Sequence, residues 1–493
     1  MMIEEKRIVE AEQELNKLKE KVSEHQWRLH YHVAPIANWM NDPNGFCYFK
    51  GEYHLFYQHH PFAPKWDTMY WGHVKSKDLV NWEHLPPALA PGESYDKDGC
   101  FSGSAIEKDG KLYLMYTGNV WTGDNYDEDL KQVQALAVSE DAIRFEKLSV
   151  NPVIAEAPEG DIHPFHFRDP KVWKHEENYY CVLGSKTLDN IGQVLLYRSR
   201  DLMSWEFINV IAKGEGNFGY MWECPDLFEL DNKDILVMSP QGVKPEGDRY
   251  HNLHQAGYVI GELDYDKGSL SYGEFQLLDD GFDYYAPQTM LDHQGRRIVI
   301  AWMDMWESDM PTQEHGYTGA MTIPRVLELK NNKLQSSPVK ELEQLRRKET
   351  AYENVILNDE LTLANIEGNC LELDITFEMK QLATFGIRMR VDDSVGEETV
   401  LTYYGQKGIF EFDRNESGKG PGGIRKTTIP LIDNKLHLRI FIDKSSVEVF
   451  IHNGEYVMTG RIYPGETSNK ICFFSDEEIE INTLKKWDLK RTI

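Results

Sequence analysis

The stretch GEYHLFY at Gly51–Tyr57 decides the fold, because its pattern of a turn residue followed by a strand-like run returns four more times. The later copies are GKLYLMY (Gly110–Tyr116), ENYYCVL (Glu177–Leu183), NKDILVM (Asn232–Met238) and GRRIVIA (Gly295–Ala301). They recur about every 55 to 67 residues, a period longer than that of a common propeller blade but of the same radial kind. We therefore predict an all-β fold that begins with a five-bladed β-propeller over residues 27–340.

A second repeat supports the same division into blades. The segments SKDLVNW (Ser76–Trp82), SEDAIRF (Ser139–Phe145) and SRDLMSW (Ser199–Trp205) follow the first three runs at similar distances. Two independent sequence repeats with the same period indicate equivalent structural units.

Three acidic motifs lie just upstream of three of these runs. They are WMNDPNG (Trp39–Gly45), FRDP (Phe167–Pro170) and WECP (Trp222–Pro225), and their acids Asp42, Asp169 and Glu223 stand eight or nine residues ahead of the run. In a propeller we expect them to converge on one mouth of the central channel. A fold tolerates three mutually repelling carboxylates mainly where a pKa must be raised or a cation held.

The corresponding positions of the second and fifth blades are Phe101–Gly103 and Ala286–Gln288. These segments are small or polar, which suits a sugar better than a multivalent metal. Each acidic motif alone is a common turn or loop, so the catalytic interpretation depends on their shared register.

Hydrolysis of a glycosidic bond needs one carboxylic acid to protonate the leaving oxygen and one carboxylate to attack the anomeric carbon or activate a water. Asp42 lies in a stiff Asn-Asp-Pro-Asn-Gly turn, which suits a nucleophile. Glu223 lies between Trp222 and Cys224, and we expect this apolar company to raise its pKa and make it the proton donor.

The length of 493 residues predicts more than one domain. Residues 1–26 are charged and predict a helix with a narrow apolar stripe (Ile8, Leu15 and Val22), which we expect to pack against the body of the protein. Residues 341–352 predict a short, charged helical linker. Alternating strands over 353–493 predict an antiparallel β-sandwich with a structural or interface-forming role.

The composition excludes several classes of partner. A net charge of −28 with no polybasic stretch argues against nucleic acid and against an anionic membrane surface. The six cysteines form no C-x-x-C pair, so neither a zinc site nor a dense disulfide framework is expected. No secretory signal or membrane span is recognisable, which predicts a cytoplasmic protein. We expect no cofactor and no metal, and a homodimer remains possible.

Taken together, the motifs resemble glycoside hydrolase family 32, the β-fructofuranosidases, which include bacterial sucrose-6-phosphate hydrolases and intracellular invertases. Trp39–Gly45 resembles the sucrose-binding box of the family, and the later boxes match FSGSA (Phe101–Ala105), FRDP and WECPDL (Trp222–Leu227). The segment FIDKSSVEVF (Phe441–Phe450) resembles the signature of the family's sandwich. The resemblance covers nearly the whole chain.

The resemblance implies a role for each acid. Asp42 matches the nucleophile that forms a fructosyl-enzyme intermediate, Glu223 the acid/base, and Asp169 the carboxylate that binds fructose hydroxyls and steadies the transition state. Cys224 is expected to be a packing thiol beside Glu223. The expected pocket residues are Trp39, Asn41, Gln58, Trp66, Trp71, Phe101, Ser102, Arg168, Tyr285 and Trp302, with core packing as the alternative for Trp66 and Trp302.

The expected activity is retaining hydrolysis of terminal β-D-fructofuranosides, with sucrose 6-phosphate or sucrose as substrate. An intracellular β-fructosidase for short, kestose-type fructo-oligosaccharides is the alternative. A non-catalytic sugar-binding propeller would be expected to lose Asp42 or Glu223, and an arabinan-degrading propeller would lack the Trp39–Gly45 box and the sandwich. The candidates for binding a substrate phosphate are Lys65, Lys244, Arg249, His251 and His254.

Overall fold

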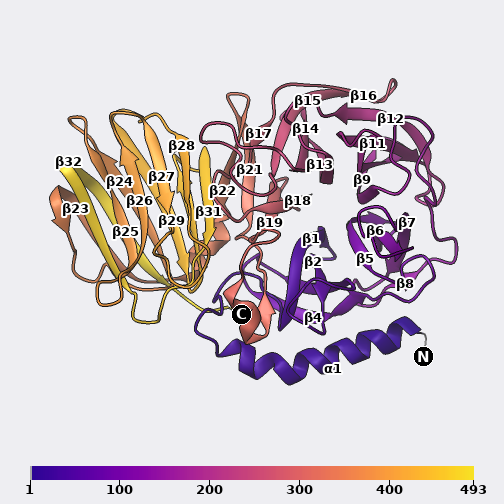
Figure 1. The fold of residues 1–493 in the computed structure, drawn as a ribbon, viewed down its shortest axis with the longest axis horizontal. Helices are drawn as coiled ribbons and strands as arrows, with labels where there is room; N and C mark the ends of the chain where they lie inside the picture. Colours follow the sequence, from indigo (N-terminus) through magenta and orange to yellow (C-terminus); the bar gives the residue numbers. More distant parts are fainter. Residues whose placement is uncertain (1–2, 493) are drawn as a thin grey trace.

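The computed structural model describes residues 3–492 and places two β-rich bodies side by side (Figure 1). Five sheets surround a central opening in the first body, and one curled antiparallel sheet forms the second. Helix α1 (Ile3–Ser23) runs along the outside of the first body. The predicted five-bladed propeller, C-terminal antiparallel β domain and short N-terminal helix are confirmed. No helix in the described part of the chain has the length and apolar character to cross a membrane.

Each blade is an antiparallel meander whose first strand lies innermost. The five first strands contact one another in a ring around the channel. The strands of the blades, in chain order, are β1 (Asn38–Phe49), β2 (Glu52–His60), β3 (Tyr70–Ser76) and β4 (Trp82–Leu89); β5 (Cys100–Lys108), β6 (Lys111–Trp121), β7 (Leu130–Ser139) and β8 (Glu146–Lys147); β9 (Phe167–His175), β10 (Asn178–Lys186), β11 (Gly192–Ser199) and β12 (Glu206–Lys213); β13 (Met221–Leu230), β14 (Lys233–Gln241), β15 (Gly257–Asp264), β16 (Ser269–Tyr272) and β17 (Gln276–Leu277); β18 (Tyr285–Leu291), β19 (Arg297–Trp302), β21 (Arg325–Lys330) and β22 (Lys333–Pro338).

The sequence repeats correspond to the same parts of successive blades. The five strand-like runs fall on the second strands β2, β6, β10, β14 and β19. The second repeat is a turn after the third strand, in which Asp78, Asp141 and Asp201 each accept two hydrogen bonds from backbone N–H groups of the next three residues. At the turn these backbone N–H groups have no partner in the sheet, and the aspartates accept their hydrogen bonds instead. The same requirement in each blade explains why this part of the sequence repeats.

The ring is closed by a segment that follows the fifth blade's second strand. After the 3₁₀ turn η1 (Pro311–His315), the short strand β20 (Tyr317–Thr318) pairs in parallel with β1. Asn38 lies opposite Tyr317 in this pairing. The first and last blades are thereby joined by main-chain hydrogen bonds beside the channel.

Helix α1 packs against the propeller, as predicted. Its buried residues are Ala11, Leu15 and Val22, which form one stripe. The Arg7 guanidinium donates to the Pro91 carbonyl oxygen at 2.9 Å, so polar contacts also fix the helix to the first blade's edge.

The segment expected to be a linker, 341–352, contains most of the 3₁₀ turn η2 (Lys340–Leu345) and the start of strand β23. The second body is one antiparallel sheet that curls because the long strand β32 pairs with β25 through its first part and with β24 through its second. Its strands are β23 (Arg346–Leu361), β24 (Leu371–Glu378), β25 (Thr384–Asp392), β26 (Glu397–Tyr404), β27 (Ile409–Asp413), β28 (Ile424–Thr428), β29 (Lys435–Asp443), β30 (Ser446–Ile451), β31 (Tyr456–Arg461) and β32 (Lys470–Leu489).

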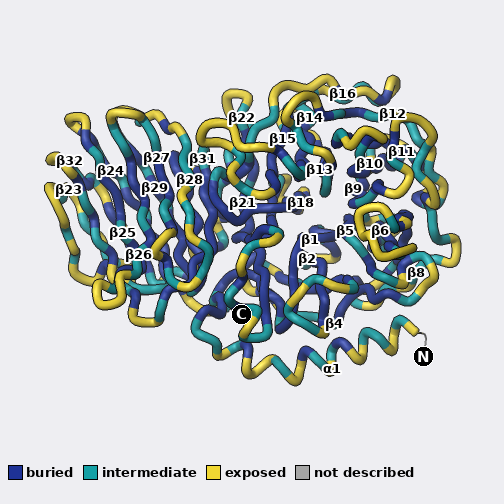
Figure 2. Tube along the Cα trace, in the orientation of Figure 1, coloured by how far each residue is buried: buried dark blue, intermediate teal, exposed yellow. Residues whose placement is uncertain are grey.

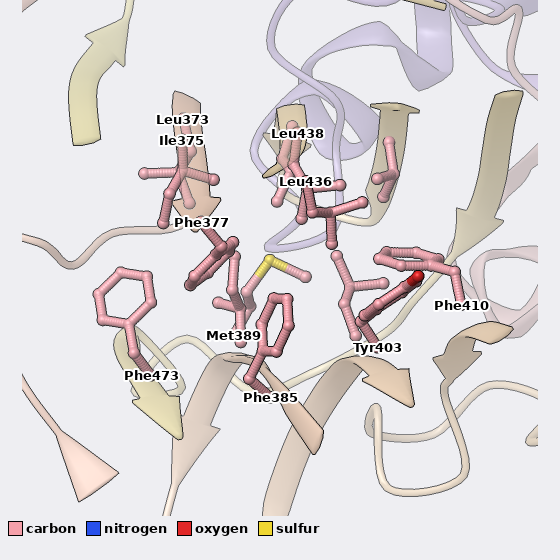
Figure 3. Packing of buried hydrophobic residues seen from close by; sticks show 14 of the residues in the cluster. Leu373, Ile375, Phe377, Phe385, Met389, Tyr403, Phe410, Leu436, Leu438 and Phe473 are labelled. Atoms are coloured by element: carbon pink, nitrogen blue, oxygen red, sulfur yellow. The ribbon is translucent and has the colours of Figure 1, made fainter. Parts of the chain in front are cut away.

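The inner face of the curled sheet is a continuous apolar core. Alternate residues of β24, including Leu373, Ile375 and Phe377, point toward Phe385 and Phe473 from other strands (Figure 3). Burial runs through both bodies and through the region where they meet, whereas the loops at the rims are exposed (Figure 2). The two bodies therefore share an extensive buried boundary.

A buried network of charges joins the two bodies. His32 of the propeller contacts Asp443 (Nδ1 to Oδ2, 2.8 Å) and Glu448 (Nε2 to Oε1, 2.9 Å) of the curled sheet. Arg325, on β21, donates to Glu448 and also to Asp279, the latter at 3.0 Å. All five side chains are fully buried. Because each charge is paired, the network is tolerated only with both bodies in place.

Replacing Arg325 with methionine should destabilise the protein strongly. Loss of the guanidinium leaves Glu448 and Asp279 as buried carboxylates without their cation, a change that costs about 3–5 kcal/mol. Urea unfolding measures the free-energy difference. The control is Arg198→Met, which removes an exposed pair with Glu206 worth at most about 1 kcal/mol. Equal, small losses in both variants would contradict this view of the boundary.

Candidate active site

The first strand of every blade carries a β-bulge at the same level of the channel. At each bulge the inner strand has one residue more than its neighbour. Four of the five bulges contain a proline, which a bulge accommodates because it interrupts the ladder of hydrogen bonds. These prolines are Pro43, Pro170, Pro225 and Pro287. The three acidic motifs are therefore bulges that direct side chains into the channel.

The bulge of the second blade uses glycine in place of proline. A Cβ atom on Gly103 would lie 2.0 Å from the Met115 carbonyl oxygen, so no other residue fits without movement. The backbone N–H of Gly103 donates to Asn44 Oδ1 of the first blade at 3.1 Å. This bond ties two neighbouring bulges together beside Ser102.

In the third, fourth and fifth blades, the residue before the proline has a positive φ. The angles are 63° at Asp169, 48° at Cys224 and 49° at Ala286. Such angles are uncommon for residues with a Cβ, and residues before proline usually adopt extended backbone. The repeated distortion is local strain retained at the channel mouth, and it lets the consecutive residues Arg168 and Asp169 line the same pocket.

A pocket of about 360 Å³ opens at this mouth, and Asp42, Asp169 and Glu223 all line it. The convergence expected from the sequence is therefore found. Asp42 and Asp169 directly precede their prolines, whereas Glu223 lies one residue earlier in its bulge. Glu223 thus occupies the position that Arg168 has in the third blade.

The Asp42 carboxylate is held by three neighbouring groups. Asn41 Nδ2 donates to its Oδ1 at 3.1 Å, and Ser102 Oγ donates to its Oδ2 at 2.9 Å. The Cys224 thiol lies 3.6 Å from the same Oδ2 and 3.7 Å from Oδ2 of Asp169. The backbone N–H of Cys224 also donates to Asp169 at 2.9 Å. Cys224 therefore bridges two carboxylates and is more than the apolar packing group expected from the sequence.

Glu223 has polar surroundings, contrary to the expectation from its sequence neighbours. Arg168 donates to Oε1 from Nε at 3.0 Å and from Nη2 at 2.7 Å. Tyr285 and Gln241 donate to Oε2 at 2.6 and 2.8 Å. Burial opposes ionisation, but the Arg168 charge and the Tyr285 hydrogen bond outweigh it and lower the pKa of Glu223. The prediction of a raised pKa for Glu223 is wrong.

The other two carboxyls shift in the opposite direction. Burial and then the charge of Glu223 raise the pKa of Asp42 to about 6. Burial raises the pKa of Asp169 to about 7, although the neighbouring Arg168 opposes the shift. Asp42 and Asp169 therefore hold protons closer to neutral pH than ordinary carboxyls do, whereas Glu223, paired with Arg168, does not.

Two family models together match nearly the whole chain. The description "Glycosyl hydrolases family 32 N-terminal domain" matches residues 32–338, and the description "Glycosyl hydrolases family 32 C terminal" matches residues 341–488. The chain belongs to glycosyl hydrolases family 32. The first match ends just before η2 and the second begins within it, between the fifth blade and the curled sheet.

Family 32 proteins resemble this chain along its whole length. The sucrose-6-phosphate hydrolase of Zymomonas mobilis is 40% identical, with 98% of this chain and 96% of that protein covered. A Bombyx mori family 32 β-fructofuranosidase, solved as a mutant in complex with sucrose, is 36% identical and superposes with a TM-score of 0.86 over 99% of both chains. The sucrose-6-phosphate hydrolase structure from Lactobacillus gasseri is 31% identical, with a TM-score of 0.87 over 98% of this chain and 97% of that one.

Most of the pocket residues expected from the family resemblance do line the pocket. They are Asn41, Gln58, Trp66, Phe101, Ser102 and Arg168. Trp66 is therefore a pocket residue, and its ring meets that of Phe101 edge-on at a centroid distance of 6.1 Å. Gln58 is oriented by a 3.0 Å bond to the Cys100 carbonyl oxygen.

Four other expected residues lie behind the pocket wall. Tyr285 acts through its bond to Glu223, and Trp39 donates its ring N–H to Asn41 Oδ1 at 2.6 Å. Trp71 donates to the Phe101 carbonyl oxygen at 3.0 Å. Trp302 is fully buried and packs against its neighbours, so its contacts are those of the core-packing alternative.

Sequence reasoning missed several pocket residues on the rim. These are Trp121, Tyr126, Asp127, Leu130, Gln132, His166, Gln241, Trp306 and Glu307. Trp121 and Tyr126 stack at 4.4 Å in the loop between β6 and β7. Aromatic residues in that Gly-, Asn- and Asp-rich loop were the available signal, but nothing in the repeat assigns a loop to one mouth of the channel.

Of the five residues considered for phosphate binding, His254 lines the pocket, and Lys244 lines a neighbouring cavity. His254 lies close enough for its charge to lower the pKa of Glu223. Lys65, Arg249 and His251 line neither space within the described residues.

A group of three potential metal ligands lies away from this pocket. Within residues 3–492, His30, Cys370 and Asp443 have ligand atoms within 4.8 Å of one another. The Asp443 carboxylate already accepts hydrogen bonds from His32 and from the backbone N–H groups of His30 and Tyr31. Those bonds assign Asp443 to the boundary between the two bodies.

Removing the Ser102 hydroxyl should shift the acid limb of the pH–rate profile. If Asp42 is the nucleophile that the family resemblance implies, its ionised form is required for attack, and activity should fall as the pH drops through its pKa of about 6. The Ser102 bond stabilises the ionised form. Ser102→Ala should therefore raise the pKa and move the acid limb of kcat/KM upward by about one pH unit, since a bond to a charged group is worth about 1.5–3 kcal/mol.

The control is Ser102→Thr, which keeps a hydroxyl and should keep the wild-type limb. For both variants, kcat/KM is measured as a function of pH between about 4 and 8. An acid limb that stays in place in Ser102→Ala would show that this bond does not set the pKa of Asp42.

Proposed function

We propose that this family 32 β-fructofuranosidase hydrolyses sucrose 6-phosphate or sucrose with retention of configuration, using Asp42 and Glu223. The observation that carries the proposal is the meeting of Asp42, Asp169 and Glu223 in one pocket beside Arg168. A double-displacement glycosidase needs one carboxylate to attack the anomeric carbon and one carboxylic acid to protonate the leaving oxygen, and Asp42 and Glu223 supply two carboxyl groups in one pocket. A non-catalytic sugar-binding protein would have no use for this arrangement.

Asp42 is the proposed nucleophile. The donors Asn41 and Ser102 fix its two oxygens, and the proline that follows it stiffens the bulge. A carboxylate held in this way can meet the anomeric carbon without reorganising. The product of the attack is a fructosyl ester on Asp42, with the bond to the leaving oxygen broken.

Glu223 is the proposed acid/base. The proton shared among the carboxyls must lie on Glu223 when the leaving oxygen departs, and Glu223 is ionised afterwards. Arg168 and Tyr285 then stabilise the new carboxylate, which takes a proton from the incoming water. These contacts therefore stabilise the ionised form of Glu223, which is present after Glu223 has protonated the leaving group.

Asp169 is the proposed ligand of the fructose hydroxyls. Its Oδ2 accepts the backbone N–H of Cys224, and the positive φ of Asp169 keeps the side chain at the channel mouth. Hydrogen bonds to hydroxyls can strengthen as the sugar ring gains positive charge. The aromatic rings of Trp66 and Phe101 form part of the pocket wall.

The substrate assignment is supported by relatives that match nearly the full length of the chain. The names sucrose-6-phosphate hydrolase and β-fructofuranosidase recur among them, and one solved relative contains sucrose. This pattern favours sucrose 6-phosphate or sucrose over the kestose-type alternative. The six cysteines are free thiols, which supports the proposed cytoplasmic location.

Azide should separate the roles of Glu223 and Asp42. Glu223→Ala cannot protonate the leaving group or deprotonate water, so its activity on sucrose should fall by several orders of magnitude. With β-fructosyl fluoride, whose leaving group needs little protonation, the fructosyl-enzyme should still form. Azide needs no deprotonation, so it should speed turnover of that substrate by Glu223→Ala and yield fructosyl azide.

The matched variant is Asp42→Ala, which lacks the nucleophile and should gain nothing from azide. Steady-state fluoride release measures both variants. Azide rescue of Asp42→Ala alone would mean that the nucleophile and the acid/base have been exchanged.

A further inference from the structure

A second cavity lies at the opposite mouth of the propeller channel. It has a volume of about 380 Å³ and is lined by later residues of all five inner strands, four of which (β1, β5, β9 and β13) line the catalytic pocket with their earlier residues. On β9, for example, Arg168 and Asp169 face the catalytic pocket, whereas Lys171–His175 line the second cavity. The five inner strands can be followed around the central opening in Figure 1.

A narrow neck separates the two spaces. The neck has a volume of only about 10 Å³, with Asp169 and Cys224 among its lining residues from the catalytic side and Lys171 and Asp226 from the other. That volume holds about one water molecule. A sugar cannot pass through it, so a ligand of the second cavity is distinct from the substrate.

The floor of the second cavity has an excess of positive charge. Lys171 is buried and donates to Asp226 Oδ2 at 2.9 Å and to the Thr289 carbonyl oxygen at 2.5 Å. Arg297 approaches the same floor, and burial lowers the pKa of both cations. Asp226 is a single carboxylate opposite two cations.

The guanidinium of Arg297 is poorly satisfied. Its hydrogen bond from Nη1 to Thr289 Oγ1 is long, at 3.5 Å, and its Cζ atom lies 4.5 Å from the centre of the Phe228 ring. Among the described residues, its buried Nε has no hydrogen-bond partner. An unpaired buried N–H on a cation is costly, so this edge of the guanidinium is suited to an acceptor that enters the cavity.

The acids at the rim do not neutralise this floor. Glu107 and Glu229 line the cavity but are exposed to water, and Asp234 accepts the backbone N–H of Leu263 at 2.7 Å. Exposed charges are screened within a Debye length of about 8 Å at physiological salt, whereas buried ones are screened much less. The rim also includes the exposed cation Lys174.

We propose that this second cavity binds a small oxyanion, with Arg297 and Lys171 as the recognising cations. A planar guanidinium with a free N–H edge matches the paired oxygens of a phosphate or carboxylate group. The bound oxyanion supplies the negative charge that the floor lacks. It is independent of fructoside hydrolysis, so the proposed enzymatic function stands whether or not the oxyanion binds.

Calorimetric titration with inorganic phosphate tests the site, at constant ionic strength and with acetate in a parallel titration. Binding to the wild-type protein is expected, and Arg297→Met, which keeps the packing on Phe228, should weaken it at least about tenfold. The control is Arg249→Met, which removes an arginine that does not line this cavity, and it should leave the affinity unchanged. Binding of phosphate, of acetate or of both, with this dependence on Arg297, identifies the preferred oxyanion and supports the site.

Crystals of the wild-type protein soaked in selenate locate the anion even if Arg297→Met does not fold. An anomalous peak within hydrogen-bond distance of Arg297 is expected. Absence of binding by both anions, equal affinities in wild type and Arg297→Met, or a selenate peak only at the catalytic pocket would each overturn the proposal.

Discussion

The catalytic end of this molecule is organised around the repulsion of three buried carboxyl groups. Asp42, Asp169 and Glu223 enter one pocket from three blades. A single guanidinium, that of Arg168, lines the same pocket and forms a salt bridge with Glu223. Their opposite pKa shifts follow from how that charge is distributed: the acid paired with Arg168 is favoured as the anion, and the others are favoured as acids. The bulges, the prolines and the positive φ angles hold the acids at this mouth against their repulsion.

The curled C-terminal sheet contributes to the site through the segment that leads into β18. The backbone N–H of Phe282 donates to the Thr459 carbonyl oxygen at 2.7 Å, and Asp283 accepts the backbone N–H of Arg461 at the same distance. This segment ends at Tyr285, which bonds Glu223. The sequence predicted a structural or interface-forming role for the second domain, and these contacts extend that role to the positioning of a catalytic-pocket group.

The repeats were enough to predict the blades because each blade places the same kind of turn before the same buried strand. The convergence of Asp42, Asp169 and Glu223 followed from that register. The surroundings of Glu223 could not be predicted from Trp222 and Cys224, since Arg168 and Tyr285 come from other blades and Gln241 comes from the next strand of the same blade. In a propeller, neighbours in space at the channel are mostly distant in sequence.

The other differences between the residues predicted from the sequence and those found in the structure have a related cause. Trp302 was expected in the pocket from the family resemblance but is buried behind the wall, whereas Trp121, at the end of β6, and Tyr126, in the loop that follows, line the pocket. The strand residues Leu130, Gln132 and Gln241 were missed because they stand outside the repeated acidic motifs. The second cavity also escaped sequence reasoning, because Lys171 and Arg297 come from different blades and meet only in the folded ring.

The central claim is that Asp42 forms a covalent bond to fructose, while Glu223 protonates the leaving group and then takes a proton from water. Trapping tests it most directly: Glu223→Ala is mixed with β-fructosyl fluoride, quenched in acid, digested, and analysed by mass spectrometry. The account predicts a mass increase of one fructosyl unit on the peptide that contains Asp42, and on no other peptide. A label on the peptide that contains Asp169, or an unlabelled protein under conditions in which fluoride is released in a burst, would contradict it.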